Sequence, residues 1–462
     1  MANTGNPARS QAAANTKKLI DWAVEAVSKP LPEPVRRRAA IILADDVGAM
    51  VAGSLEAQVA RAREGLLRTS GKAEATVLAK GAPRADRYAA ASANGMAITW
   101  CELDEGFRNA SCHGGAYTLP ALLAEAEAQG CSVEEVLRAL AVAYEVTTRF
   151  ALAFPFPVFN VHPHAAFAAI GGAAAASLAR RQDAGTMLSA VTGGASMSFA
   201  GPFDTAVEGA LVRNAWTSAG AWLGLRAADW AEAGIGGGAV TPYDVFVGAY
   251  NTRAVPEALV EGLGSAWSVT NGYHKVFACC GYAHAAIEAT LDLLGRMKEK
   301  KKEDIAEIVV EAAPGGQALR TVEPETVLAA KFSMPHAIAA TVQLGTAGAR
   351  AFTQDKLEDE GIASMRKRVR LEAYKDLKPW PNDRPARVTL RFGDGAEMSA
   401  VVESARGGAD KPFDEPTLLS KLAENAGSVF PAVPETMKKI IAGDAALLAR
   451  PWGTALAGMV KP

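Results

Sequence analysis

Residues 35–53 read VRRRAAIILADDVGAMVAG, a stretch that follows Pro34 and ends in glycine. Proline is favoured in the first turn of a helix and glycine near its end, so the stretch predicts a helix. Four later stretches also carry apolar residues at helical spacing and end near glycine or basic residues. They are TLPALLAEAEAQG (118–130), VEEVLRALAVAYEVTTRFAL (133–152), HAAFAAIGGAAAASLARR (164–181) and AWTSAGAWLGLRAADWAEAG (215–234). The first half is therefore predicted to be mainly α, and its many small residues favour closely crossing helices.

The pattern changes after about residue 266. The segment DIAEIVVEAAP (304–314) alternates and is β-branched, and RPARVTLRFGDGAEMSAVVES (384–404) predicts two strands around the turn at residues 393–395. Between them, MPHAIAATVQLGTAG (334–348) predicts a helix. Residues 412–431 and 434–452 return to a helical pattern. We therefore expect a mainly α fold, with helical parts at 1–266 and 409–462 and a smaller α+β unit at 267–408.

Composition limits the partners. The chain has 462 residues, with Lys+Arg 48 against Asp+Glu 50, which lacks the positive excess needed to bind nucleic acid. Five cysteines without CxxC spacing indicate neither a disulfide framework nor a zinc site, so we expect a cytoplasmic protein. The most apolar run, residues 165–179, is too short to cross a membrane. The first twenty residues do not resemble a secretory signal, and we expect a loose tail there.

All six histidines lie between residues 113 and 336, which is the first indication of function because histidine transfers protons near neutral pH. The segment WCELDEGFRNASCHGGAYTLPALLAE (100–125) predicts a loop that brings together Asp104, Glu105, Arg108 and His113. The carboxylates and the histidine could form a proton-transfer pair or bind a metal, and the arginine could bind an anion. They could equally be the solvated charges of a capped loop.

A second candidate segment is FNVHPHAAFAAIGGAAAAS (159–177), where His162 and His164 precede a predicted helix. A helix N-terminus favours anions and disfavours a protonated histidine, so a neutral base beside a bound carboxylate is one reading. An HxH metal pair is the other, although no third ligand stands at diagnostic spacing.

Cations in apolar surroundings form a third group. Lys275 lies between His274 and His284. Arg213 and Lys331 occur in similarly apolar segments. Such residues could bind a carboxylate, or their charged ends could simply reach solvent. The sequence contains no P-loop, no GxSxG and no HExxH motif, and the GxGxxA match at residues 234–239 follows a predicted helix rather than a strand.

Several of these segments, in this order, resemble the MmgE/PrpD family over roughly residues 35–400. The resemblance is carried by Asp46-Val-Gly48, Ala93-Asn94-Gly95 leading into Asp104, His113 ahead of Leu119-Pro120, His162-Pro163, Val212-Arg213-Asn214, Tyr273-His-Lys275 with Cys279-Cys280 and His284, and Ala330-Lys331-Phe332-Ser333. The family includes 2-methylcitrate dehydratase, cis-aconitate decarboxylase and iminodisuccinate epimerase. It implies a large helical domain made from both chain ends, an inserted α+β lid domain, an active site in the cleft and a homodimer.

The resemblance implies an enzyme without cofactor or metal that acts on a small di- or tricarboxylic acid, most simply a dehydratase or decarboxylase. Its catalytic residues are expected at Asp104, His113, His162 and Lys275, and substrate binding at Arg213, Lys331, His164 and His284. Lys275 and Arg213 would stabilise an enediolate, one of His113 and His162 would take the proton, and the other histidine or Asp104 would return it. We expect Lys275→Ala to reduce activity far more than stability.

Two positions depart from the family pattern: Gly114 stands where many members have proline, and Glu105 where a second aspartate is frequent. The sequence leaves dehydration, decarboxylation and epimerisation open. A metal-dependent hydrolase and a non-catalytic helical binding protein are the alternatives from other classes.

Overall fold

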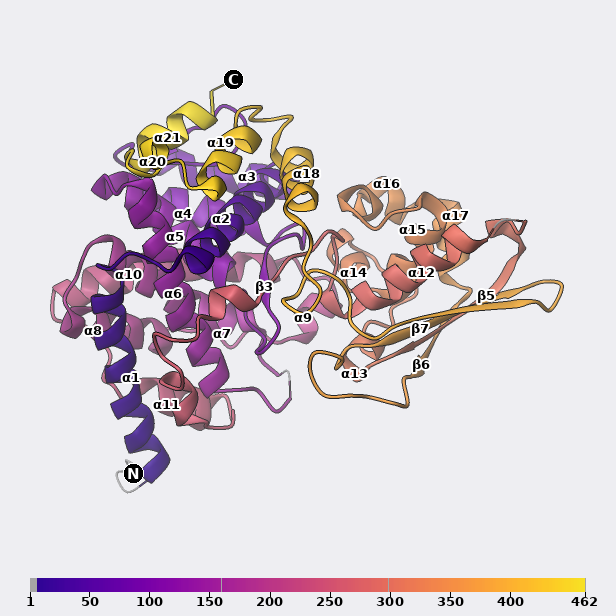
Figure 1. The fold of residues 1–462 in the computed structure, drawn as a ribbon, viewed down its shortest axis with the longest axis horizontal. Helices are drawn as coiled ribbons and strands as arrows, with labels where there is room; N and C mark the ends of the chain where they lie inside the picture. Colours follow the sequence, from indigo (N-terminus) through magenta and orange to yellow (C-terminus); the bar gives the residue numbers. More distant parts are fainter. Residues whose placement is uncertain (1–5, 159, 298, 462) are drawn as a thin grey trace.

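The computed structural model describes residues 6–158, 160–297 and 299–461, and it is mainly α, as the sequence predicts. A large helical body carries a smaller α+β unit on one side (Figure 1). The first part of the body contains α1 (Pro7–Ala26), α2 (Glu33–Ser54), α3 (Ala57–Arg68), α4 (Arg87–Ile98), α5 (Gly114–Gln129), α6 (Val133–Ala153), α7 (Pro163–Ala179), α8 (Ala184–Ser196), α9 (Asp204–Val207), α10 (Val212–Glu232) and α11 (Thr241–Tyr243).

Helix α7 lies at the centre of the body, where α5, α6, α8 and α10 surround it and bury every one of its residues. Glycines of α10 let that helix approach α7 closely. A Cβ atom at Gly224 would lie 2.4 Å from the backbone carbon of Gly172, and one at Gly220 would lie 2.4 Å from the Cβ of Ala168. The small residues thus serve close helix crossing, as predicted. Among the described helices, none is long and apolar enough to span a bilayer.

The N-terminal segment is not a loose tail, so that expectation is wrong for the described residues. Helix α1 begins at Pro7, and the side chain of Asn6 caps it by accepting the backbone N–H groups of Ala8 and Arg9. Leu19 and Ile20 on the same helix are buried. Burial of this apolar face stabilises the helix, which the polar, alanine-rich sequence alone does not predict.

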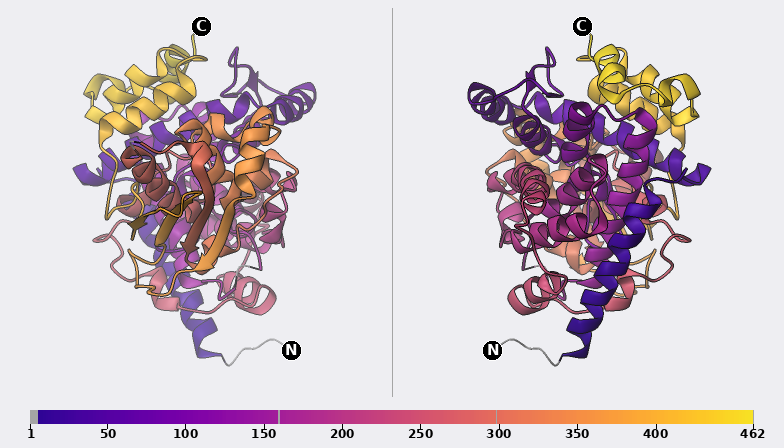
Figure 2. Two further views of the ribbon diagram at one scale, coloured as in Figure 1. Left: turned by 90° about the vertical axis from the view of Figure 1, so that its right-hand side faces the viewer. Right: turned by 90° about the vertical axis from the view of Figure 1, so that its left-hand side faces the viewer.

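The C-terminal helices return to the body. They are α18 (Glu415–Ala426), α19 (Val433–Ala442), α20 (Ala445–Leu448) and α21 (Trp452–Met459). Helices α18 and α19 pack on α2, and α21 packs on α5 and α6. Figure 2 shows them at the opposite end of the body from the start of α1. The two ends of the chain therefore build one helical body.

The α+β unit has a four-stranded sheet in the order β6-β5-β7-β8, from β5 (Ile305–Ala312), β6 (Val369–Ala373), β7 (Ala386–Phe392) and β8 (Glu397–Val402). β5 is parallel to β6 and antiparallel to β7, and β7 and β8 form the predicted hairpin. Its helices are α12 (His284–Arg296), α13 (Pro314–Gln317), α14 (Val327–Lys331), α15 (Met334–Leu344), α16 (Gln354–Leu357) and α17 (Glu360–Arg366). Helices α12 and α15 cover the sheet. The unit boundaries at residues 266 and 408 stay a prediction.

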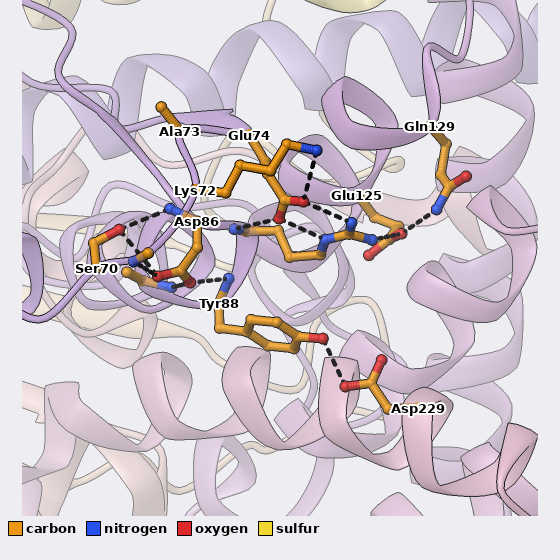
Figure 3. Close-up of polar contacts among 12 residues, drawn as sticks. Ser70, Lys72, Ala73, Glu74, Asp86, Tyr88, Glu125, Gln129 and Asp229 are labelled. Atoms are coloured by element: carbon orange, nitrogen blue, oxygen red, sulfur yellow. Dashed lines mark hydrogen bonds and ion pairs between the residues drawn. The ribbon is translucent and has the colours of Figure 1, made fainter.

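A buried ion network ties four helices of the body together. Glu125 on α5 is fully buried and pairs with Arg87 of α4 at 2.7 Å and with Arg180, which follows α7, at 3.1 Å. Arg87 also binds Glu74, and Arg180 binds Asp229 of α10. Figure 3 shows the part of this network that lies between Glu74 and Glu125. One buried carboxylate thus links two cations, each of which has a second acidic partner.

Glu125→Ala is expected to lower the free energy of unfolding by about 3 kcal/mol, because it leaves Arg180 buried with less compensation. Urea denaturation followed by circular dichroism measures the change. Lys72→Ala is the matched control, since Lys72 lies 3.8 Å from Glu74 with its side chain 85% exposed. That substitution should change stability by less than about 0.5 kcal/mol. Equal stability of the two variants would contradict the assigned role of Glu125.

Candidate active site

A cavity of about 100 Å³ lies where the helical body meets the α+β unit. Both parts supply its walls: the loop before α5, the start of α7 and Arg213 of α10 come from the body, and Phe332 and Arg384 from the α+β unit. Its charged and titratable lining residues are Glu102, Arg108, Cys112, His113, His162, Arg213, Tyr273, Lys275, Cys280, Tyr282 and Arg384. Four residues predicted from sequence, His113, His162, Arg213 and Lys275, therefore line one cavity.

A short ladder joins the two loops that carry the chemistry. Strand β3 (Gly106–Phe107) pairs antiparallel with β4 (Gly272–Tyr273), with Gly106 opposite Tyr273. Asp104 lies just before β3 and Lys275 just after β4. Pairing in this register brings the two side chains together, and the Nζ atom of Lys275 lies 3.2 Å from Oδ1 of Asp104.

Asp104 and His113 form a carboxylate–imidazole pair. Oδ2 of Asp104 lies 2.7 Å from Nδ1 of His113, and the carbonyl oxygen of Glu105 lies 3.0 Å from the same nitrogen. Because both neighbours are acceptors, Nδ1 carries the proton. Nε2, which has no hydrogen-bond partner among the described residues, is then free to exchange a proton with a ligand. The side chain of His113 is 21% exposed, whereas Asp104 is fully buried.

His113 is placed by the start of α5. The sequence predicts a loop as far as residue 117, but the helix begins at Gly114 and His113 is its N-cap residue. The earlier start holds the imidazole at the helix end, beside the cavity. This difference arises because proline is favoured in the first turn of a helix, which predicts a start near Thr118, whereas Pro120 stands inside α5.

Lys275 is fully enclosed and has two acidic partners. Its Nζ atom lies 3.2 Å from Asp104 and 3.6 Å from Oε2 of Glu102. Burial alone would lower the pKa of Lys275, but the two carboxylates outweigh it and raise that pKa. Conversely, burial would raise the pKa of Asp104, while Lys275 and His113 hold it well below its usual range. Lys275 is thus an ammonium and Asp104 a carboxylate.

His162 and Arg213 lie side by side at the cavity wall. Burial, together with the charges of Arg213 and His113, lowers the pKa of His162 well below its usual value, so the ring is neutral. Two N–H groups point at this ring, and a neutral imidazole accepts from only one: the backbone N–H of His164 lies 3.2 Å from Nδ1, and the Nε–H of Arg213 lies 3.4 Å from Nε2. The shorter contact favours the tautomer that carries its proton on Nε2. In that tautomer His162 and Arg213 are both donors, and a ligand oxygen near both would accept from each.

Glu102 is a site residue that the sequence reading missed. It pairs with Arg213 at 2.5 Å and faces Lys275, so one carboxylate links the two buried cations. Its backbone has a φ of 54°, a left-handed conformation that costs a non-glycine residue about 1 kcal/mol or more. The sequence could have indicated Glu102, because this residue lies in the same loop as Asp104.

The other predicted binding residues lie behind the cavity lining. His164 packs with its ring 4.5 Å from that of His162 and 4.9 Å from that of His113, and its Nδ1 contacts the Tyr117 hydroxyl at 2.8 Å. His284 accepts the hydroxyl of Tyr273 at Nδ1, and burial lowers the pKa of His284 to about 3. Both histidines can position lining residues without contacting a ligand in the cavity.

Lys331 lies outside this cavity. Its Nζ atom donates to the carbonyl oxygen of Trp100 at 2.8 Å, and the residue lines a separate hollow with Asn214 and Glu325. The remaining histidines are also remote: His274 contacts Asp45 at 2.6 Å, and His336 contacts the Ala351 carbonyl at 3.0 Å. Three of the six histidines therefore form the cluster at the cavity. Within the described part of the chain, no three or more His, Cys, Asp or Glu side chains are grouped as metal ligands.

Glu105 and Gly114, the two positions that depart from the pattern noted in the sequence, both lie beside Tyr144. The Tyr144 hydroxyl donates to Oε1 of Glu105 at 2.5 Å, and the N–H of Gly115 donates to Oε2 at 3.2 Å. A Cβ atom at position 114 would lie 2.4 Å from the Tyr144 ring. Glycine at 114 therefore leaves room for the tyrosine that holds Glu105, whose own carbonyl contacts His113.

Glu105 makes stability depend on pH. Burial raises its pKa to about 8, although hydrogen bonds from Tyr144 and Gly115 favour the carboxylate. The folded protein therefore keeps a proton that the unfolded chain releases above its pKa of about 4.3. Stability from this group is fully present below that pKa and is lost as pH rises through about 8, at up to about 1.4 kcal/mol per pH unit.

Glu105→Gln is accordingly expected to flatten the fall in stability between about pH 5 and pH 8, because the amide mimics the protonated acid and does not titrate. Urea denaturation at several pH values measures the slope. Glu424→Gln, at an exposed position of α18, should retain the wild-type slope. An unchanged slope in the Glu105 variant would show that the acid is ionised in the folded protein.

Comparisons with known proteins cover most of the chain. Residues 17–253 match the MmgE/PrpD N-terminal domain, and residues 277–447 match the MmgE/PrpD C-terminal domain. The chain is 25% identical over 456 residues to cis-aconitate decarboxylase of Aspergillus terreus, covering 90% of this chain and 89% of the relative. It is 25% identical over 443 residues to cis-aconitate decarboxylase-like protein oryM of Aspergillus oryzae (strain ATCC 42149 / RIB 40), covering 90% and 91%. The similarity includes both the helical body and the α+β unit.

Proposed function

The chain belongs to the MmgE/PrpD family, and we propose that it is a lyase that removes carbon dioxide from cis-aconitate or a closely related unsaturated polycarboxylate. Two relatives with cis-aconitate decarboxylase in their names support the substrate class. The observation that carries the proposal is the Asp104–His113 pair, which contacts Lys275 through Asp104 at the wall of a small cavity. A proton donor and a cation are the two groups that such a decarboxylation requires.

The reaction balances with groups of this chain alone. The bond between the CH₂ carbon and its carboxylate breaks, and carbon dioxide leaves. The electron pair forms a new double bond to that CH₂ carbon, and the former double-bond pair moves toward the carboxylate at the far alkene carbon, as an enediolate. A proton then adds to that carbon. Protonated His113 gives it from Nε2 and regains one from water, while Asp104 offsets the charge of the protonated ring.

The buried cations stabilise the charge that develops. Lys275 and Arg213 are both almost fully buried, where an ion pair with substrate is screened far less than in water. Arg213 and the Nε2–H of His162 bind a carboxylate as donors, so we assign His162 to substrate binding rather than to proton transfer. Glu102 keeps Arg213 and Lys275 in position before substrate arrives.

The test is incubation with cis-aconitate in heavy water containing a chelator. We expect carbon dioxide in amounts equal to the substrate consumed, and a five-carbon dicarboxylate with one deuterium at the protonated carbon, measured by mass spectrometry and NMR. Activity in chelator is expected because no step uses a metal.

Parallel incubations with 2-methylcitrate and iminodisuccinate separate the other reactions. Loss of water from 2-methylcitrate without decarboxylation of cis-aconitate would make the protein a dehydratase, and inversion of one stereocentre of iminodisuccinate would make it an epimerase. Loss of all activity in chelator, restored by one metal ion, would favour the hydrolase alternative instead.

We further expect a cytoplasmic homodimer in which the α+β unit moves as a lid. Light scattering should then give about twice the chain mass of 48.1 kDa. A measured mass of one chain at all protein concentrations would contradict the prediction of a dimer.

A further inference from the structure

The cavity has a second pair of cations, Arg108 and Arg384, that the mechanism above does not use. Arg108 follows β3 in the helical body, whereas Arg384 lies between β6 and β7 in the α+β unit. The sequence singles out Arg108 as a charged group in the loop with Asp104 and His113, but it gives no indication of Arg384.

Arg108 is held rigidly. Its guanidinium donates to Oδ1 of Asp383 at 3.0 Å, to the carbonyl oxygen of Pro381 at 3.2 Å and to the hydroxyl of Ser404 at 3.3 Å. It lies 5.8 Å from the centre of the Tyr273 ring, and its side chain is 7% exposed. Its Nε atom is buried and has no hydrogen-bond partner among the described residues. A buried donor without a partner costs free energy unless a ligand satisfies it.

Arg384 is oriented by stacking rather than by hydrogen bonds. Its guanidinium lies 4.4 Å from the centre of the Tyr282 ring, and its Nε atom lies 3.5 Å from Oδ2 of Asp383. In the described parts of the chain, no acceptor forms a hydrogen bond with its terminal nitrogens. Stacking fixes the plane of the guanidinium while leaving its N–H edge available, which suits the two parallel hydrogen bonds that a carboxylate accepts.

The charges at this end of the cavity do not cancel. Two guanidiniums face one carboxylate, Asp383, whose side chain is 34% exposed. At the other end, Arg213 and Lys275 are matched by Glu102 and Asp104. Tyr282 lines both the cavity and a larger groove, so Arg384, which stacks on Tyr282, lies near the place where the two meet. The excess positive charge therefore lies at a wall of the cavity where a bound carboxylate would offset it.

We propose that Arg108 and Arg384 form a second carboxylate subsite, which binds the distal carboxylate of a di- or tricarboxylic acid whose reacting end lies at His113 and Lys275. The assignment of the reacting end rests on the proposed function, whereas the subsite itself does not. The subsite selects acids with two or more carboxylates over monocarboxylates, because only they can satisfy both ends.

The test measures binding without turnover. Propane-1,2,3-tricarboxylate is saturated and cannot decarboxylate by the route above, so calorimetry with this probe reports affinity alone. Arg384→Met should weaken its binding by about 10–100-fold, the loss expected for a charge-assisted hydrogen bond to a carboxylate. Binding of butanoate, a monocarboxylate followed by NMR, should be unchanged. Arg384→Lys keeps the charge but not the planar fork, and should give an intermediate loss.

Arg406→Met is the matched control. Arg406 also stacks on an aromatic ring, that of Phe413 at 5.4 Å, and pairs with Glu288, but it is 59% exposed and does not line the cavity. It should bind the tricarboxylate as the wild type does. Circular dichroism confirms that each variant is folded, and Arg384→Lys serves if the methionine variant is not.

The outcomes separate this proposal from the proposed function. Weakened tricarboxylate binding in the Arg384 variants, without turnover of cis-aconitate by the wild type, would keep the subsite and overturn the decarboxylase. Turnover with tricarboxylate affinity unchanged in a folded Arg384 variant would overturn the subsite. Failure of the wild type to bind the tricarboxylate, or equal weakening of butanoate binding, would also overturn it.

Discussion

Replacing His113 by asparagine is expected to lower kcat by about 10²–10⁴-fold, the usual contribution of a positioned acid–base group. Asparagine can still donate to Asp104 but cannot deliver a proton. Because the His113 side chain is 21% exposed and lies at the cavity wall, little packing is lost, and the free energy of unfolding should change by less than about 1 kcal/mol. Steady-state kinetics and urea denaturation measure the two effects.

His162→Asn provides the comparison. If His162 binds a carboxylate together with Arg213, this variant should mainly raise KM, whereas the His113 variant should mainly lower kcat. Asp104→Asn should cost nearly as much as His113→Asn, and the double variant little more than either, because the two residues act as one unit. A wild-type kcat in the His113 variant, or fully additive losses, would remove this pair from proton transfer.

Replacing Lys275 by methionine is expected to lower kcat/KM by about 10²–10³-fold, the loss typical of removing one group that stabilises an oxyanion. The structure adds a second effect. Lys275 lies between Asp104 and Glu102, and its removal leaves two buried carboxylates with fewer positive partners. Breaking a buried ion pair from one side costs about 3–5 kcal/mol of stability. The sequence alone suggested that activity would fall far more than stability, and the burial of both acids changes that expectation.

A second substitution separates the two effects. Lys275→Met leaves the carboxylates of Glu102 and Asp104 with Arg213 as their common cation, and Glu102→Gln restores the charge balance, so part of the stability should return while activity stays low. Thermal denaturation and kinetics of the single and double variants give the comparison. Recovery of activity together with stability would show that Lys275 acts only on the fold.

The sequence determined the secondary structure over most of the chain. The proline and glycine signals around residues 35–53 locate α2, and the alternating text of residues 384–404 gives the β7–β8 hairpin. These predictions hold because they depend on local propensity and on one buried face. The sequence missed α1, whose stability comes from burying Leu19 and Ile20 against the body. It also missed β6, a short edge strand that is defined by its pairing with β5.

Part of the candidate site could also be predicted from the sequence, and part could not. The histidines and cations could be chosen as candidate site residues from the sequence, because such residues are unusual in apolar segments. Three of those histidines do cluster at the cavity. Only the tertiary structure decided which of them share it. A two-residue ladder between β3 and β4 brings Asp104 to Lys275, and stacking on Tyr282 brings Arg384 to the same cavity. Contacts between segments so far apart depend on packing of the whole chain, and so few residues leave no periodic pattern for a sequence to reveal.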